Sequence, residues 1–120
     1  MSRRLTVLLV PVVLLAAIFA LPAQGAKKRA PVKTVGVVDY AYTPARLTVR
    51  PGTRIVWKWD AANSAPHDVK LTAAPRGVRR FLSPTATASF TFARTLTAKG
   101  TYRLLCTFHA TVMRQTIVVK

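Results

Sequence analysis

The chain of 120 residues contains no glutamate, three aspartates, two histidines and one cysteine. So few carboxylates argue against a hydrolase that works through paired acids and bases. A single cysteine cannot close a disulfide within the chain. Whatever chemistry the chain performs therefore depends on very few reactive side chains, and each of them is informative.

The N-terminus has the layout of a secretory signal peptide. The basic start Met1–Arg4 precedes an uncharged apolar run, Leu5–Leu21, and small residues follow it. The run is shorter than the ~20 apolar residues of a spanning helix and contains Pro11, which favours cleavage over a retained membrane anchor. We expect residues 1–25 to be a signal peptide, residues 26–32 a flexible basic leader, and residues 33–120 a single domain. The domain is then exported, to the periplasm or to the outer face of the cell envelope.

Positive charge is abundant: 19 lysines and arginines give a formal net charge of +16. Such a field favours acidic partner proteins or anionic surfaces such as the cell envelope. Nucleic acid is the common partner of a basic domain, but the chain has no nucleic-acid motif and its N-terminus indicates export. We therefore expect an acidic protein partner and no nucleic acid, with association with an anionic envelope surface as a second possibility.

A period of two runs through the rest of the chain. Alternation in 54–60 puts Ile55, Trp57 and Trp59 on one face, and Pro51-Gly52 supplies a turn before it. Short strands separated by proline and glycine, with no helical periodicity, are typical of an all-β protein. We expect a Greek-key β-sandwich of about seven to eight strands. The segment Leu71–Pro84 is the least strand-like and is expected to connect the sheets.

Residues that bind metals gather near the C-terminus. Cys106, His109 and Met113 lie close together, and His67 is the other histidine. Alternation in 101–106 directs Cys106 inward, and a short loop returns His109 and Met113 to the same point. Each residue alone has a structural explanation, such as core filling by methionine. Together they form the donor set of a mononuclear blue-copper site, so we expect one copper ion per chain.

Other metal sites fit less well. Zinc also binds cysteine and histidine. A binuclear copper site needs a second cysteine, and a multicopper oxidase needs further histidines that the chain does not have. We therefore expect a copper protein that is not an enzyme.

From Val35 onward the chain resembles the plastocyanin-like cupredoxins, which are small exported blue-copper proteins. The resemblance rests on segments 39–44, 47–53, 56–57, 66–69, 100–102 and 106–109 together with Met113. It implies a Greek-key sandwich, type 1 copper and one-electron transfer. It also implies that His67, Cys106 and His109 are the strong equatorial ligands and that Met113 is the axial one.

Two features depart from the family pattern. Three residues separate His109 from Met113, where two or four are more common, and Asp68 follows the first histidine where asparagine is frequent. We expect Asp68 to accept hydrogen bonds from the Thr107 hydroxyl or from backbone amides. Its negative charge is expected to favour Cu(II) and to lower the reduction potential.

The predicted function is transport of single electrons between redox partners. Electrons would pass through His109, with Phe108, Ala110 and Val112 as an apolar contact patch and Arg114 beside it. The expected partner is an acidic cytochrome or oxidase domain, and the carrier is expected to be a monomer. Two alternatives stay open: a protein that binds or delivers copper without a redox role, and a structural module that has lost its metal.

Overall fold

The computed structural model describes residues 8, 10–14, 16–21 and 28–120. The predicted end of the signal peptide, at residue 25, lies outside these residues. Within the described part of the chain, no helix is long and apolar enough to cross a membrane. Among the residues described, regular structure begins at Val32, one residue before the predicted start of the domain.

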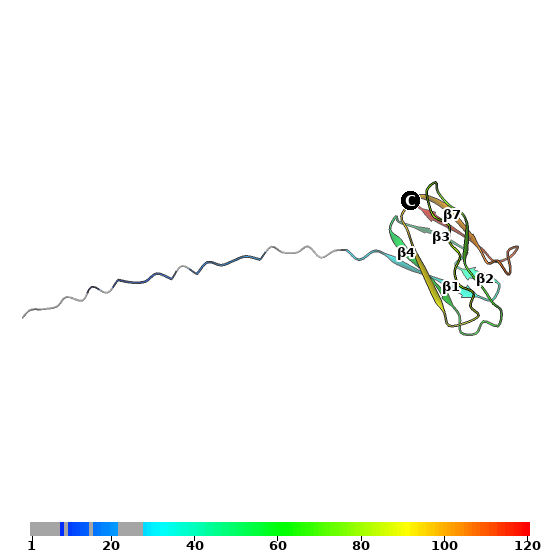
Figure 1. Ribbon diagram of the computed structural model, residues 1–120, viewed down its shortest axis with the longest axis horizontal. Helices are drawn as coiled ribbons and strands as arrows, with labels where there is room; N and C mark the ends of the chain where they lie inside the picture. The colour runs from blue at the N-terminus through cyan, green and yellow to red at the C-terminus, as the bar shows by residue number, and fades with distance from the viewer. Residues whose placement is uncertain (1–7, 9, 15, 22–27) are drawn as a thin grey trace, which may run out of the picture.

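In the described part of the chain, eight strands form two sheets that pack face to face (Figure 1). The strands are β1 (Val32–Val38), β2 (Ala41–Thr43), β3 (Arg46–Val49), β4 (Thr53–Trp59), β5 (Lys70–Ala73), β6 (Thr91–Leu96), β7 (Gly100–Leu105) and β8 (Arg114–Val119). Their order is β2-β1-β4-β6 in one sheet and β3-β8-β7-β5 in the other. The chain crosses between the sheets repeatedly, as a Greek key requires. The predicted all-β sandwich is confirmed.

The predicted alternation builds the core between the sheets. Ile55, Trp57 and Trp59 of β4 are buried, while the residues between them are more exposed. Tyr102 and Leu104 of β7 are buried in the same way, opposite them in the second sheet. Because side chains alternate along a strand, the apolar face of each sheet meets that of the other.

A buried glutamine joins the two sheets. The Trp57 indole N–H donates to Gln115 Oε1 at 2.9 Å, and Gln115 Nε2 donates to the Pro44 carbonyl oxygen at 2.8 Å. Trp57 lies in β4 and Gln115 in β8, so this pair crosses the core. A buried polar group is tolerated only when its hydrogen bonds are made, as they are here.

The segment predicted to connect the sheets, Leu71–Pro84, is partly a strand. Its first residues belong to β5, which pairs antiparallel with β7 and places Leu71 opposite Leu104. The connection itself runs from the end of β5 to the start of β6. Pro75 and Gly77 follow β5 closely, which made so short a strand hard to recognise from its alternation.

The sandwich has two distinct ends. One, the site end, carries the Asp39-Tyr40 turn, the β4–β5 loop and the β7–β8 loop. The other, the far end, carries the leader before β1, the turn before β4, the turn before β7 and the C-terminus. Backbone hydrogen bonds hold the far end together: Arg54 N–H to the Pro31 oxygen at 2.8 Å, and Gly52 N–H to the Leu96 oxygen at 2.9 Å.

We expect Gln115→Leu to lower the free energy of unfolding by about 1–3 kcal/mol, because it leaves the buried Trp57 N–H without a partner. Urea denaturation measures this loss. In a Trp57→Phe background, Gln115→Leu should lower the free energy of unfolding by less, because the indole N–H donor is already absent. Equal costs in both backgrounds would show that the hydrogen bond does not stabilise the sandwich.

Candidate metal centre

Cys106, His67 and His109 meet at the site end. Cys106 directly follows β7, His109 lies in the loop to β8, and His67 lies just before β5. Their potential ligand atoms lie within 4.8 Å of one another. Cys106 Sγ is 3.9 Å from His67 Nδ1 and 3.6 Å from His109 Nδ1. Metal bonds of about 2.0 Å to nitrogen and 2.3 Å to sulfur require separations of this size, so one ion fits between the three atoms.

The three residues differ in exposure. Cys106 and His67 are fully buried, as the strand alternation predicted for Cys106. His109 is partly exposed and is the member of the group that reaches the surface. An ion held here is therefore mostly shielded from water, with one imidazole as its link to the outside.

Met113 closes the loop that carries Cys106 and His109. Its carbonyl oxygen accepts from the Cys106 N–H at 3.0 Å, and its own N–H donates to the His109 oxygen at 2.9 Å. Its side chain is fully buried. The three-residue spacing that departs from the family pattern is thus accommodated in a compact turn, and Met113 lies with the other three residues.

Asp39 orients His67 from the side away from Cys106. His67 Nε2 lies 2.8 Å from Asp39 Oδ1. The Ser64 backbone N–H and then the His67 ring hold the pKa of Asp39 well below its usual value, so Asp39 is a carboxylate at neutral pH. A carboxylate at Nε2 keeps the ring proton there, which turns the Nδ1 lone pair toward the sulfur. Sequence reasoning missed this role, although Asp39 is one of only three acidic residues.

Tyr40 lies against both imidazoles. Its ring is perpendicular to that of His109, with centroids 4.8 Å apart, and to that of His67 at 6.2 Å. Its backbone φ of 65° is in the left-handed region, which costs a side-chain-bearing residue about 1–2 kcal/mol. The two-residue turn between β1 and β2 thus places Asp39 against His67 and Tyr40 against both histidines. Segment 39–44 is part of the family resemblance, but nothing in the sequence indicated this position of Tyr40.

Asp68 ties the two ligand loops together, as predicted. Its Oδ1 accepts from the Thr107 N–H at 2.7 Å, and its Oδ2 accepts from the Thr107 hydroxyl. The Tyr42 hydroxyl donates to the Asp68 backbone oxygen at 2.5 Å. Burial, followed by the nearby charges of Cys106 and Asp68, raises the pKa of Tyr42, so its hydroxyl stays a donor.

The donor set fits one copper ion. Cu(I) prefers sulfur and Cu(II) prefers imidazole nitrogen, and a His₂Cys group with a weak methionine serves both states. In the part of the chain that the structure describes, no second group of three or more histidine, cysteine or acidic residues is placed to hold a metal. The fold and this site together define a small β-sandwich protein with a mononuclear copper centre.

The chain belongs to the family of cupredoxin-like domains, whose model matches residues 11–119. The resemblance seen in the sequence motifs is thereby confirmed. None of the curated proteins is similar enough to count as a relative of this chain.

Solved structures share the fold. The reduced Cu(I) form of an amicyanin variant is 26% identical, with a TM-score of 0.63, and the match covers 80% of this chain and 87% of that one. A purple cupredoxin from Nitrosopumilus maritimus is 23% identical with a TM-score of 0.61, over 72% of this chain and 98% of the other. A copper-containing nitrite reductase from Thermus scotoductus SA-01 is 24% identical with a TM-score of 0.66, over 84% of this chain but 24% of that enzyme. The last two show the fold alone.

We expect Asp39→Asn to weaken copper binding about ten- to hundredfold, because the carboxylate that fixes the ring proton of His67 is lost. Competition with a chelator measures the affinity. Nitrogen chemical shifts of the His67 ring in the metal-free protein report the tautomer directly. Asp60→Asn is the matched control, since Asp60 accepts a hydrogen bond from the Ala62 N–H and contacts no histidine. Equal losses in both variants would contradict the positioning role of Asp39.

Proposed function

We propose that this chain is a type 1 copper protein that carries single electrons between redox partners in the cell envelope. In this proposal His67, Cys106 and His109 are the equatorial ligands and Met113 is the axial one. The observation that carries the proposal is the position of the Cys106 sulfur, which faces the Nδ1 atoms of both histidines in a buried site. Copper in such a site supplies a reversible one-electron couple.

The protein keeps the donor atoms in place. The His67 backbone is held by two hydrogen bonds to Ala86, and the Trp59 indole donates to the His67 oxygen at 3.3 Å. On the other loop, the His109 N–H donates to the Cys106 oxygen at 3.2 Å. A frame fixed in this way suits electron transfer, because little has to move when the oxidation state changes.

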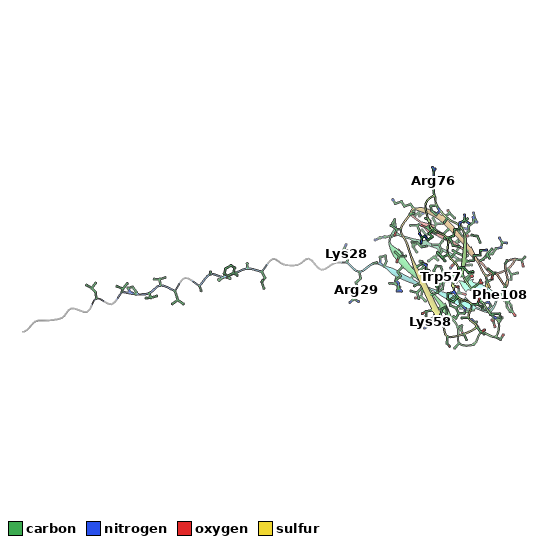
Figure 2. All side chains as sticks on the ribbon, viewed as in Figure 1. Lys28, Arg29, Trp57, Lys58, Arg76 and Phe108 are labelled. Atoms are coloured by element: carbon green, nitrogen blue, oxygen red, sulfur yellow. The ribbon has the colours of Figure 1, made fainter. Side chains whose placement is uncertain are left out.

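An apolar rim around His109 supports a brief contact with a partner. Tyr40, Phe108 and Val112 are 54%, 51% and 67% exposed, and Ala110 lies between the last two. Figure 2 shows Phe108 at the edge of the molecule farthest from Lys28 and Arg29. We define the apolar rim as these four residues, which adds Tyr40 to the patch predicted from the sequence. Small apolar patches are typical of short-lived redox complexes.

One cation is fixed beside the rim. Arg114 Nε donates to the Ala110 oxygen at 2.7 Å, which holds its guanidinium group next to the exposed part of the loop. A guanidinium in this place favours an acidic partner, such as a cytochrome or an oxidase domain. We propose that the carrier is a monomer and that residues 1–25 direct its export.

Delivery of copper to another protein is the alternative function, with the same ligands. The burial of His67 and Cys106 favours retention of the ion over its release. The two functions differ in measurable ways, because a carrier shows a reversible potential and slow copper exchange, whereas a delivery protein gives up its copper readily.

Reconstitution with Cu(II) is expected to give an intense blue charge-transfer band that disappears in Cys106→Ser. Visible and EPR spectra measure it, because the band arises from the thiolate–copper bond. Voltammetry and chelator exchange on the same sample then separate carrier from delivery protein. A colourless protein that takes up no copper would refute both.

We expect Asp68→Asn to raise the reduction potential by about 40–130 mV. Asparagine keeps the shape and the hydrogen bond from the Thr107 N–H but removes a negative charge close to the site. A unit charge several ångström away is worth roughly 1–3 kcal/mol at an effective dielectric of about 20, and removing it disfavours Cu(II). Voltammetry of both proteins tests this, and an unchanged or lower potential in the variant would contradict it.

A further inference from the structure

The acidic side chains of this protein are confined to one end, whereas its lysines and arginines lie at both. The three aspartates all lie at the site end: Asp39 in the β1–β2 turn, and Asp60 and Asp68 in the β4–β5 loop. All three accept hydrogen bonds there. Because the chain has no glutamate, the far end has no carboxylate side chain at all.

The far end is crowded with exposed cations. They come from the leader, the first residues of β1 and β4, the turns before β4 and β7, the start of the β5–β6 connection and the C-terminus: Lys28, Arg29, Lys33, Arg50, Arg54, Arg76, Lys99 and Lys120. Lys28, Arg29, Lys33 and Arg50 line one open hollow there. We call this set the basic end.

These cations have no acidic partner within the protein. Among the described residues, the one basic side chain within salt-bridge distance of a carboxylate is His67, whose Nε2 lies 2.8 Å from Asp39 Oδ1 at the site end. No described lysine or arginine is paired with a carboxylate. The basic end is therefore an uncompensated positive surface, and its charge is available to an outside anion.

The path of the chain adds a second observation. The leader joins the domain at the basic end, where the Arg54 N–H donates to the Pro31 oxygen at 2.8 Å. In Figure 2 the leader, marked by Lys28 and Arg29, enters on the side opposite Phe108. Clustered, exposed lysines and arginines are attracted to anionic lipid head groups.

We propose that the basic end docks on a bilayer surface rich in anionic lipids, with the apolar rim and the metal site facing away from the bilayer. A bilayer suits this end better than a single acidic protein, because the cations are spread over several turns and the first residues of β1 and β4. The docked orientation leaves the apolar rim free for a partner. This surface is separate from the proposed electron-transfer site and does not depend on it.

Vesicle binding by the copper-loaded protein, as isolated, tests the proposal. The measured quantity is the ratio of affinities for vesicles of equal parts phosphatidylglycerol and phosphatidylcholine and for vesicles of phosphatidylcholine alone. The ratio removes any binding that does not depend on the charge of the lipid. We expect strong preference for the anionic vesicles and steep weakening with added salt.

Two triple variants, each losing three charges, locate the binding surface. Lys33→Gln, Arg50→Gln and Lys99→Gln neutralise the basic end, whereas Lys58→Gln, Lys70→Gln and Arg79→Gln remove exposed charges elsewhere. The first set should lower the affinity for anionic vesicles about a hundredfold, since each charge near such a surface contributes roughly a factor of five. The second set should lower it less than about tenfold. Equal losses, or no preference for anionic lipid, would overturn the proposal.

Two further measurements complete the test. If soluble polyglutamate binds at the basic end while anionic vesicles do not, the surface serves an acidic protein and the proposal fails. For orientation, the Cu(I) protein is placed on anionic bicelles that contain a lipid with a gadolinium head group. The amide signals of Gly52 and Gly100 should broaden while those of Phe108 and His109 stay sharp. The reverse pattern would overturn the orientation.

Discussion

The hydrogen bond between Asp39 and His67 is the interaction on which the site depends. A buried imidazole needs a partner at both ring nitrogens. Asp39 satisfies Nε2 at 2.8 Å, whereas Nδ1 meets only the Cys106 sulfur at 3.9 Å, near the limit for a sulfur contact. Nε2 thus has a strong hydrogen bond, whereas Nδ1 points at the thiol but has only a long, weak contact with it. A metal ion bound to Nδ1 supplies the missing partner, which explains why a histidine is buried at this position.

The strand pairing of the sandwich makes this contact possible. Because β1 runs parallel to β4, the turn after β1 and the loop after β4 emerge at the same end, which brings Asp39 to His67. In the other sheet, β7 pairs with β8 up to Leu105 and Arg114, so the loop between them begins and ends at one point. Asp68 then links the two loops through Thr107. Three connections from two sheets are fixed to one another before any ion is bound.

Much of this arrangement could be predicted from the sequence, for identifiable reasons. Alternation correctly placed Trp57, Trp59 and Cys106 on inward faces, because a strand period of two is a local property. The scarcity of histidine and cysteine identified the donor set, and the position of Asp68 beside His67 predicted its bonds to Thr107. The role of Asp39 could not be predicted, since a contact across 28 residues depends on strand pairing. Tyr40 was missed because tyrosine rarely adopts a positive φ, and β5 because it is short and soon followed by proline.

The charge distribution also affects the stability of the folded protein, because no described lysine or arginine is paired with a carboxylate. Like charges on a compact surface repel one another, and the unfolded chain relieves that repulsion by expanding. At low ionic strength this repulsion therefore destabilises the folded state. Dissolved salt or a polyanionic environment screens the repulsion and stabilises the folded state. The medium in which this protein resides acts as part of its stabilisation, because surrounding anions take the place of the acidic side chains that its sequence omits.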